Sequence, residues 1–498
     1  MSENNVRVKK SVTRNAVLNV IKTVMSLAFP LITFPYSTRV LGLTAVGKYS
    51  FASAVVSYFS MVAALGITMY AVREGSKYRD DPEKTEQFCC EVFSINIYSM
   101  LITLILLYIS IFTVQKFHSY AILLMIFSVR IVLNTINVNW IYSIFEDFTF
   151  PTVSAAVMEV LSIAVMLLFV HSPDDLYIYA VSSVIAYNGY AVLTFLYARR
   201  YVRLHFIPKP SLIHLKPIMI IFFLELGMSV YVDSDIILVG WIDGDDATGL
   251  YNTASTIYKI LKQVLNALNI VVLPRIAYHV GKEAIAKENS DEQGYIENHE
   301  AAETLASQLV NTTITLALPM MVGIYILAEP IVILFAGEAF RAAYQPLQLL
   351  SIALLFAVLA TFNGQSILTA YKKETTFMYA TIVSAVVNIV LNLILIPKYH
   401  VNAAAFTTIV AECIMFVITF IAARKCLKIK VSLNVILSSV LGSAAIVPIS
   451  ILMKNMFPSS IVYLFMTIIV SVIVYGLLMI VLKNDIMREL LKKRSNEE

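Results

Sequence analysis

The sequence predicts an all-α polytopic membrane protein with fourteen transmembrane helices, arranged as two related lobes. The chain has 498 residues, of which 59% are hydrophobic and only 14% are charged, whereas a typical soluble domain has about 25% charged residues. The apolar residues are gathered in blocks of roughly the 20 residues that a helix needs to cross a bilayer. The expected spans are 16–36, 49–70, 92–113, 120–142, 152–170, 177–197, 217–240, 251–273, 308–328, 347–368, 376–396, 401–423, 435–453 and 461–482.

A twelve-residue phrase that occurs twice predicts the internal duplication. Residues 42–53 and 244–255 share Gly, Ala, Gly, Tyr, Ala and Ser at six matching positions, all at an offset of 202 residues. Six predicted spans separate the copies, and this even number gives both halves the same orientation, with a pseudo-two-fold axis along the membrane normal. Duplicated bundles of this kind are typical of secondary transporters, which bind substrate between the halves.

The spans divide the chain into four parts. Residues 1–197 form the expected N-terminal lobe, 198–216 a basic cytoplasmic linker, 217–423 the C-terminal lobe, and 424–498 two further helices with a basic cytoplasmic tail. The C-terminal lobe contains an acidic segment, 275–307, which shows no apolar stripe. We expect this segment to be a solvated cytoplasmic helix or a flexible excursion.

The positive residues predict the orientation. With the N-terminus in the cytoplasm, the inner segments hold 27 Lys and Arg and the outer loops hold 6. This asymmetry follows the positive-inside rule, so both termini are expected in the cytoplasm of a bacterial cell and the chain in its plasma membrane. The net charge of +4 then reflects membrane topology, and no nucleic-acid partner is expected. The four cysteines lack the spacing of a metal site, and no disulfide is expected.

Cations and amides inside the spans predict a polar cavity. Such residues usually face a cavity, because a charge at the bilayer centre costs roughly 2.5–3.5 kcal/mol on insertion scales. The candidates are Asn19 and Lys22 in the first span, Arg130 and Asn134 in the fourth, and Lys259, Lys262 and Asn266 in the eighth. A positive cavity at the lobe interface suits a phosphate group, and the amides suit sugar hydroxyls. For Lys22 a second interpretation stays open, in which the side chain extends back to the cytoplasmic interface.

Acidic residues in the seventh span are candidates for ion coupling. Asp233 and Asp235 point to nearly opposite sides of a helix, so they are not expected to share one site. An intramembrane acid can couple transport to a proton or sodium gradient, or it can pair with a cation on a neighbouring helix. Glu412, in the twelfth span, is expected to form such a pair within its own lobe.

No enzyme or ATP motif is present in the sequence. It contains no Walker motif, nucleophile elbow or metal-binding His and carboxylate cluster. We therefore expect a transporter without cofactor or metal, driven by a gradient or by substrate supply.

Several segments resemble the bacterial polysaccharide repeat-unit flippases of the Wzx type, which belong to the multidrug/oligosaccharidyl-lipid/polysaccharide exporter (MOP) superfamily. The segments are Arg39-Val-Leu-Gly42, Gly47-Lys-Tyr49, Tyr70-Ala-Val-Arg73-Glu74, Trp140 ahead of Glu146, Asp235-Ile-Ile-Leu-Val-Gly240, Gly249-Leu-Tyr251, Asn388 with Asn392, and Glu412. The resemblance covers nearly the whole chain. It implies alternating access of two six-helix lobes, which would move a polyprenyl-pyrophosphate-linked oligosaccharide from the inner to the outer leaflet. Its tail would stay in the membrane lipid, and a polysaccharide polymerase and export machinery would act next.

A second resemblance is to the lipid II flippases of the same superfamily, and it implies an ion site. In that family an acid on the seventh helix meets two residues one turn apart on the eleventh helix and a segment of the twelfth. Here Asp233 or Asp235, Asn388 with Asn392, and the Ala404 backbone with Thr408 match these positions. Asn392 stands where those proteins can carry an acid, so the site would hold less negative charge.

Three other functions compete with a repeat-unit flippase. A multidrug antiporter of the same fold would carry acids in its cavity, often in the first helix, where this chain has Lys22. A membrane glycosyltransferase or polymerase would need a sizeable outer loop, and every outer loop here is short. A lipid II flippase stays open as the nearest alternative.

Overall fold

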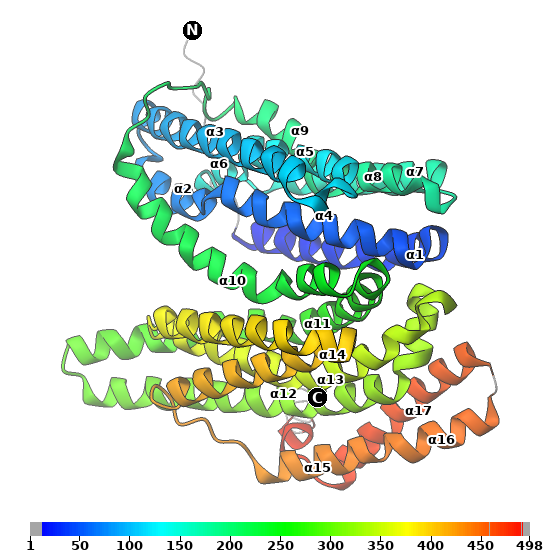
Figure 1. Ribbon diagram of the computed structural model, residues 1–498. Coiled ribbons are helices and arrows are strands. Elements are labelled where there is room, and N and C mark those ends of the chain that lie inside the picture. Colours follow the sequence, from blue (N-terminus) through cyan, green and yellow to red (C-terminus); the bar gives the residue numbers. More distant parts are fainter. Residues whose placement is uncertain (1–11, 458, 490, 492–498) are drawn as a thin grey trace. The chain divides into compact units, whose positions relative to one another are not determined.

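All regular secondary structure that the structure describes is helical, as the sequence predicts (Figure 1). The computed structural model describes residues 12–457, 459–489 and 491; the side chains at 12–24, 26–28, 224, 227–233 and 270–271 are outside this description. By packing, the chain divides into two units, unit 1 of residues 1–229 and unit 2 of residues 230–498.

Unit 1 is a bundle of helices, and its long first helix packs against α3, α5, α7 and α8. Its elements are α1 (Val12–Ala64), α2 (Ile67–Gly75), α3 (Pro82–Thr113), α4 (Gln115–His118), α5 (Ala121–Ile136), α6 (Asn139–Ile144), α7 (Thr149–Phe169), α8 (Leu176–Asn188), α9 (Tyr190–Ala198) and the first half of α10 (Leu215–Ile242). Short 3₁₀ turns precede α3, α8 and α10. The α5 helix packs against α1, α3 and α8, so these four helices surround the middle of the unit.

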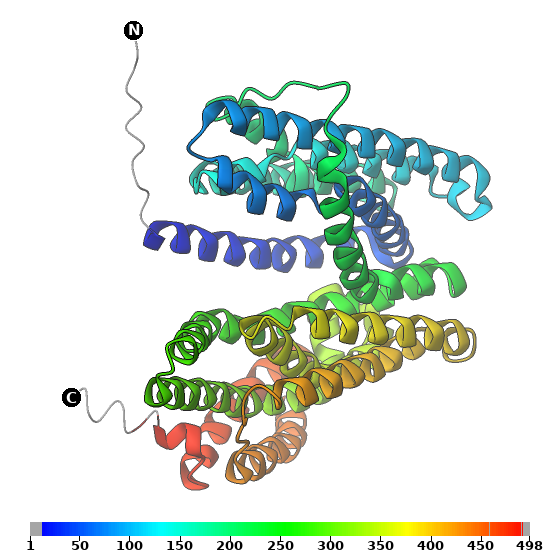
Figure 2. The same ribbon diagram turned by 90° about the vertical axis from the view of Figure 1, so that its left-hand side faces the viewer.

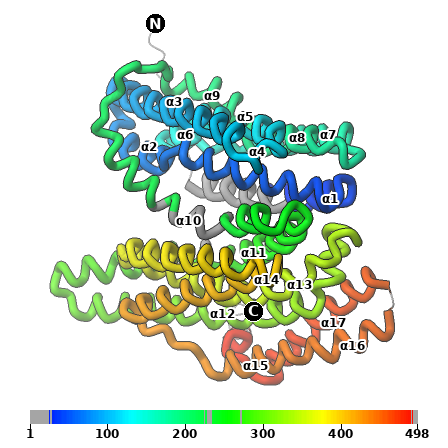
Figure 3. The backbone as a smooth tube through the Cα atoms, viewed as in Figure 1, coloured from blue at the N-terminus to red at the C-terminus, as the bar shows by residue number. Residues whose placement is uncertain are grey.

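Unit 2 contains the second half of α10 and the remaining helices. They are α11 (Asp245–Glu288), α12 (Glu292–Ala336), α13 (Tyr344–Thr361), a π-helical turn (Phe362–Leu368), α14 (Glu374–Ala423), α15 (Leu433–Ala444), α16 (Ile446–Met456) and α17 (Ser460–Val481). The α14 helix packs on α13, and α12 packs on α11, α13 and α15. In the backbone trace of Figure 3, the last three helices, α15, α16 and α17, lie along one side of α12.

The repeated phrase begins with the same backbone conformation in both units. Gly42 has φ 75° and ψ 177°, and Gly244 has φ 93° and ψ −171°. This region of φ and ψ is essentially restricted to glycine, because a Cβ would clash with the backbone. In both copies a helical segment follows directly. The preceding segment of α1 runs up to Gly42, and α10 ends at Ile242, two residues before Gly244. The duplication inferred from sequence therefore has a structural counterpart at each copy.

The membrane fold is confirmed at the level of an all-helical, multi-pass chain. Eleven helical segments of the described residues are long and apolar enough to cross a membrane. Two of them continue through a turn: α1 changes direction at Gly42, and α14 does so at His400, which has φ 55°. In both places two predicted spans share one continuous helical segment. The number of fourteen crossings and the symmetric two-lobe arrangement stay predictions.

The first and second halves of α10 pack in different units. The sequence assigns the whole seventh span to the second lobe, whereas the division by packing falls inside α10, between Ser229 and Val230. The reason is that Ile218 and Ile221, in the first half of α10, are buried in a hydrophobic core of unit 1 together with Trp140 and Tyr142.

The acidic segment 275–307 is a helical hairpin. The α11 and α12 helices extend through it, and the Asp291 side chain accepts a 2.9 Å hydrogen bond from the Gly294 N–H to begin α12. The segment is therefore helical, as one of the two predicted alternatives has it, and its cytoplasmic location stays a prediction. The expectation that the segment has no apolar stripe is wrong, because Ile276, Val280, Ala302 and Ala306 are buried in a core of unit 2. The short side chains of alanine concealed this stripe.

Candidate functional site

Asp235 is the centre of a buried polar cluster in unit 2. Its side chain lies on α10 and is 6% exposed. One carboxylate oxygen accepts hydrogen bonds from the Tyr251 hydroxyl at 2.6 Å and from the Thr408 hydroxyl at 2.9 Å. The other accepts from the Asn392 amide at 2.6 Å. Three donors on α11 and α14 thus converge on one acid.

The turn in α14 supplies the other half of this cluster. Because the helix changes direction at His400, residues before and after the turn can face one another. The Thr407 hydroxyl donates to Asn392 Oδ1 at 2.6 Å, and Asn392 Nδ2 lies 3.1 Å from Asn388 Oδ1. The Thr408 hydroxyl also lies 2.9 Å from the Ala404 carbonyl oxygen. Asn388, Asn392 and Thr407 are almost completely buried.

The structure therefore brings Asp235, Asn388, Asn392 and Thr408 together, with Ala404 beside them. These are residues that the sequence placed in one ion site by resemblance. Asp233, the other candidate acid, has a side chain outside the described residues. Sequence reasoning missed Tyr251 and Thr407. Tyr251 carried a signal, because it is one of the six matching residues of the repeated phrase.

The cluster has the chemistry of a site for a small monovalent cation or a proton. It offers one carboxylate, two amide oxygens, hydroxyls and a backbone carbonyl, and hard cations prefer such oxygen ligands. In the described arrangement the three donors stabilise the carboxylate by charge-assisted hydrogen bonds, each worth roughly 1.5–3 kcal/mol. A bound cation would require the Asn392 amide to present its oxygen, which needs only a rotation of that amide.

Lys262 forms an ion pair inside unit 2. Its ammonium group lies 2.8 Å from Glu412 Oε1, and the Tyr258 hydroxyl donates to the same oxygen at 3.2 Å. The Lys262 side chain is 22% exposed, and that of Glu412 is 3% exposed. The expectation that Glu412 pairs within its own lobe is confirmed. The sequence predicts Lys262 in a cavity. In the structure its positive charge is paired with Glu412, and its role in substrate binding stays a prediction.

The two other candidates of the eighth span lie on the same helix, α11. Lys259 is half-buried. Asn266 Oδ1 lies 3.4 Å from the Asn269 amide nitrogen. The predicted role of both residues in substrate binding stays a prediction.

Arg130 is a buried cation in unit 1. It lies on α5 and is 9% exposed. Its guanidinium donates to the Ser53 hydroxyl of α1 at 2.7 Å and lies 3.3 Å from the Ser183 hydroxyl of α8. It also stacks at 4.4 Å from the centre of the Phe127 ring. These partners carry no formal charge, and among the described atoms the buried Nε has no hydrogen-bond partner.

Asn134 extends this polar seam by one helical turn. It follows Arg130 on the same face of α5, and its side-chain oxygen accepts a 2.6 Å hydrogen bond from the Asn188 amide of α8. Ser53 carried a signal, because it is one of the six matching residues of the repeated phrase, whereas Ser183 and Asn188 had no signal beyond their polarity. Asn19 and Lys22 have side chains outside the described residues, so their place in the predicted cavity stays a prediction.

Comparison with known proteins identifies the family. Residues 12–279 match the model of the polysaccharide biosynthesis protein family, and residues 295–394 match the MatE model. A curated relative, a putative O-antigen transporter of Escherichia coli (strain K12), is 26% identical over 275 residues. That alignment covers 54% of this chain and 66% of the relative, which is just under two thirds of its length.

Solved structures show the same fold. A lipid II flippase, MurJ, in an inward closed conformation matches with a TM-score of 0.75 and 18% identity, over 95% of this chain and 100% of that one. An inward-facing multidrug resistance MATE family transporter of the MOP superfamily matches with a TM-score of 0.53 and 14% identity, over 84% and 96% of the two chains. The curated relative is described as a transporter, and these two structural neighbours are described as a flippase and a transporter. The chain belongs to the polysaccharide biosynthesis protein family and has the fold of the MOP superfamily.

Proposed function

We propose that this protein is a flippase that moves a polyprenyl-pyrophosphate-linked oligosaccharide from the cytoplasmic to the outer leaflet of the bacterial plasma membrane. The observation that carries the proposal is Arg130, a buried cation whose partners in unit 1 are neutral. The family match and the similarity to a putative O-antigen transporter support the choice of a glycan substrate.

The energetics of Arg130 favour an anionic substrate. Placing a cation inside a membrane-spanning helix costs roughly 2.5–3.5 kcal/mol. The hydroxyls of Ser53 and Ser183 solvate the guanidinium but do not neutralise it. A pyrophosphate group would neutralise the charge through strong hydrogen bonds, and this gain exists only when an anion is bound. An organic cation, the usual cargo of a drug antiporter, would be repelled.

We propose further that the Asp235 cluster couples transport to a sodium or proton gradient. A single carboxylate would be neutralised by one sodium ion or one proton, which suits a cluster that is otherwise uncharged. Because α10 also packs in unit 1 through Ile218 and Ile221, a change in how Asp235 is held would act on a helix that both units share. In this proposal no ATP or resident cofactor is needed.

The lipid tail of the substrate would remain in the surrounding membrane lipid, and only the headgroup would pass through the protein. On the outer leaflet the product would be available to a polysaccharide polymerase and to export machinery. The likeness to MurJ concerns the fold, so lipid II is the second substrate that an experiment must include.

A leaflet-accessibility assay tests the proposed function. The purified protein is placed in vesicles that contain a defined polyprenyl-pyrophosphate oligosaccharide, lipid II or a polyprenyl pyrophosphate without sugar, and a membrane-impermeant reagent reports the exposed headgroups. We expect the oligosaccharide to become accessible only in vesicles that contain protein, and lipid II to remain protected. If only lipid II is transported, the protein is a lipid II flippase. If neither lipid is transported, the proposal is overturned.

A further inference from the structure

The basic linker between α9 and α10 is held against unit 1 as an ordered strap. We define the strap as residues 199–214. Figures 1 and 2 show this segment passing over one end of α3 on its way to α10. Cys90, Ser94 and Tyr98 lie four residues apart, on one face of α3, and all three bind strap backbone groups. The Tyr98 hydroxyl donates to the Pro208 carbonyl at 2.7 Å, and Ser94 accepts from the Ile207 N–H at 2.8 Å.

A second anchor holds the C-terminal end of the strap. His214 Nδ1 lies 2.7 Å from the Tyr70 hydroxyl, and its Nε2 lies 2.9 Å from Glu91 Oε2. The side chains of His214 and Glu91 are each 14% exposed. Since α2, α3 and the strap meet at this one imidazole, the position of the strap just before α10 is fixed.

With its backbone held inward, the strap presents cations and apolar side chains outward. The exposed cations of the strap and its junction with α10 are Arg199, Arg200, Arg203, Lys209 and Lys216. Leu212 and Ile213 are 72% and 76% exposed, and Phe206 is 45% exposed. The strap contains no Asp or Glu. Two neighbouring aliphatic residues this exposed are not part of the core of unit 1.

The position of the strap along the chain places it at a membrane surface. It joins two predicted spans, 177–197 and 217–240, so both its ends are at the same face, which the charge pattern assigns to the cytoplasm. Leu212 and Ile213 come four to five residues before the second of these spans. At that distance they can reach the boundary between headgroups and acyl chains, where apolar side chains flanked by Lys and Arg are favourable.

We propose that the strap is a binding surface for anionic phospholipids of the cytoplasmic leaflet. Leu212 and Ile213 enter the interface, and Lys209 and Lys216 lie at the level of the phosphate groups on either side. Each cation near an anionic membrane surface strengthens binding by about fivefold, so the strap distinguishes anionic from neutral bilayers. This inference does not rest on the proposed flippase activity.

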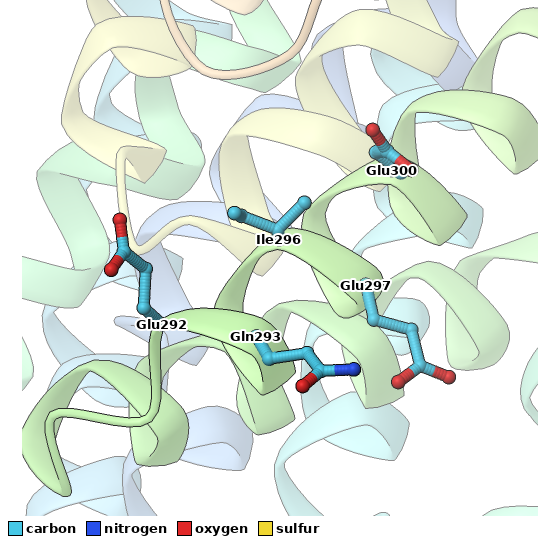
Figure 4. Close-up of a pocket in the computed structure, with 5 residues that line it drawn as sticks. All are labelled: Glu292, Gln293, Ile296, Glu297 and Glu300. Carbon is cyan, nitrogen blue, oxygen red and sulfur yellow. The ribbon is translucent and has the colours of Figure 1, made fainter.

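The acidic hairpin of unit 2 provides a matched control on the same protein. Ile296 lies on α12 and is 48% exposed. Figure 4 shows it among Glu292, Glu297 and Glu300, which line a shallow surface together with Gln293. The glutamates around Ile296 repel anionic headgroups and so keep this apolar residue away from an anionic membrane surface, although its exposure resembles that of Phe206.

The test uses an environment-sensitive dye on the full chain in nanodiscs. Ile213→Cys or Ile296→Cys is labelled in a background with Cys413→Ser and Cys426→Ser; Cys89 and Cys90 are fully buried and remain. The dye is read in phosphatidylcholine bilayers with or without phosphatidylglycerol, using lipids that carry a quencher near the headgroup. A third bilayer contains phosphatidylcholine with a polyprenyl pyrophosphate.

We expect quenching at position 213 that grows with phosphatidylglycerol, and no such growth at position 296. Adding Lys209→Gln and Lys216→Gln should weaken the phosphatidylglycerol-dependent binding reported by this quenching by about 25-fold, at about fivefold for each cation. Quenching at 213 that is absent, or that ignores lipid charge, would overturn the proposal. A response to polyprenyl pyrophosphate alone would also overturn it, because the surface would then recognise the carrier lipid and not phospholipid. Unchanged thermal unfolding of each variant confirms that the chain is folded.

Discussion

Each unit holds a buried ionisable side chain beside its copy of the repeated phrase, but the two side chains have opposite charge types. In unit 1, Ser53 of the phrase accepts a hydrogen bond from Arg130 at 2.7 Å. In unit 2, Tyr251 of the phrase donates to Asp235 at 2.6 Å. The contact is made from the serine position of the phrase in unit 1 and from the tyrosine position in unit 2. The comparison indicates that the duplicated backbone was kept while the chemistry of its two interiors diverged.

The two interiors also differ in how completely their polar groups are satisfied. Asp235 receives three hydrogen bonds, and the amides and hydroxyls around it bond to one another. Arg130 has hydroxyl and aromatic partners, and its buried Nε has none among the described atoms. A satisfied acid is suited to exchange a small ion for its hydrogen bonds. A cation with an unused hydrogen-bond donor is suited to bind an anionic ligand.

The largest expected effect follows from removing the charge of Asp235. In Asp235→Asn the side chain keeps its size but can no longer attract a cation or hold a proton. Each contact with a charged group contributes about 1.5–3 kcal/mol. Losing one such contact with the transported ion corresponds to weaker ion binding by up to about 100-fold, and we expect ion-driven transport to fall by about this factor. Transport in vesicles with an imposed sodium or proton gradient measures the change.

Asp243→Asn is the matched control for Asp235→Asn. Asp243 is the residue directly after the same helix. Its Oδ1 lies 2.7 Å from His400 Nδ1, and the His400 side chain is 70% exposed. We expect this variant to keep most of its transport. If Asp235→Asn transported as well as Asp243→Asn, with unchanged dependence on the ion, the coupling role of Asp235 would be lost.

The next effect concerns the ion pair in unit 2 and sharpens the contrast with Arg130. Glu412→Ala leaves the half-buried Lys262 without its partner, which should destabilise the fold by about 2–3 kcal/mol, less than for a fully buried pair because Lys262 is partly exposed. A double variant, Glu412→Gln with Lys262→Met, should recover most of this loss. Thermal unfolding in detergent measures both. A double variant that is fully stable but cannot transport would instead assign Lys262 to the substrate.

The smallest expected effect tests the common backbone of the two copies. Gly42→Ala and Gly244→Ala should each destabilise the protein by about 1 kcal/mol, because both backbones occupy a region that alanine avoids. No atom lies within 4 Å of the added Cβ at either position, so the effect is conformational and should be similar in the two units. Gly281→Ala, inside helix α11 and equally unobstructed, should be neutral or stabilising. Equal tolerance of all three changes in thermal unfolding would contradict this account of the repeat.

The sequence predicted those features that depend on local pattern. Hydrophobic block length predicted the helices, and the phrase at 42–53 and 244–255 predicted the duplication. Asn388 and Asn392, one turn apart, predicted a shared face. The partners of a buried charge depend instead on which helices meet. Nothing in the local sequence links Arg130 to Ser183 or Lys262 to Glu412, which are 53 and 150 residues apart. The buried stripe of the acidic hairpin was missed because alanine is only weakly hydrophobic.

The central claim is that Arg130 binds the pyrophosphate of a lipid-linked substrate. A direct measurement of lipid binding tests this claim best. Purified protein and its Arg130→Gln and Arg130→Lys variants are titrated with a polyprenyl-pyrophosphate oligosaccharide and with the same lipid lacking phosphate. We predict that Arg130→Gln weakens binding of the first lipid by about tenfold or more, that Arg130→Lys weakens it less, and that neither changes binding of the second. Undiminished binding of the pyrophosphate lipid by a folded Arg130→Gln variant would contradict the claim.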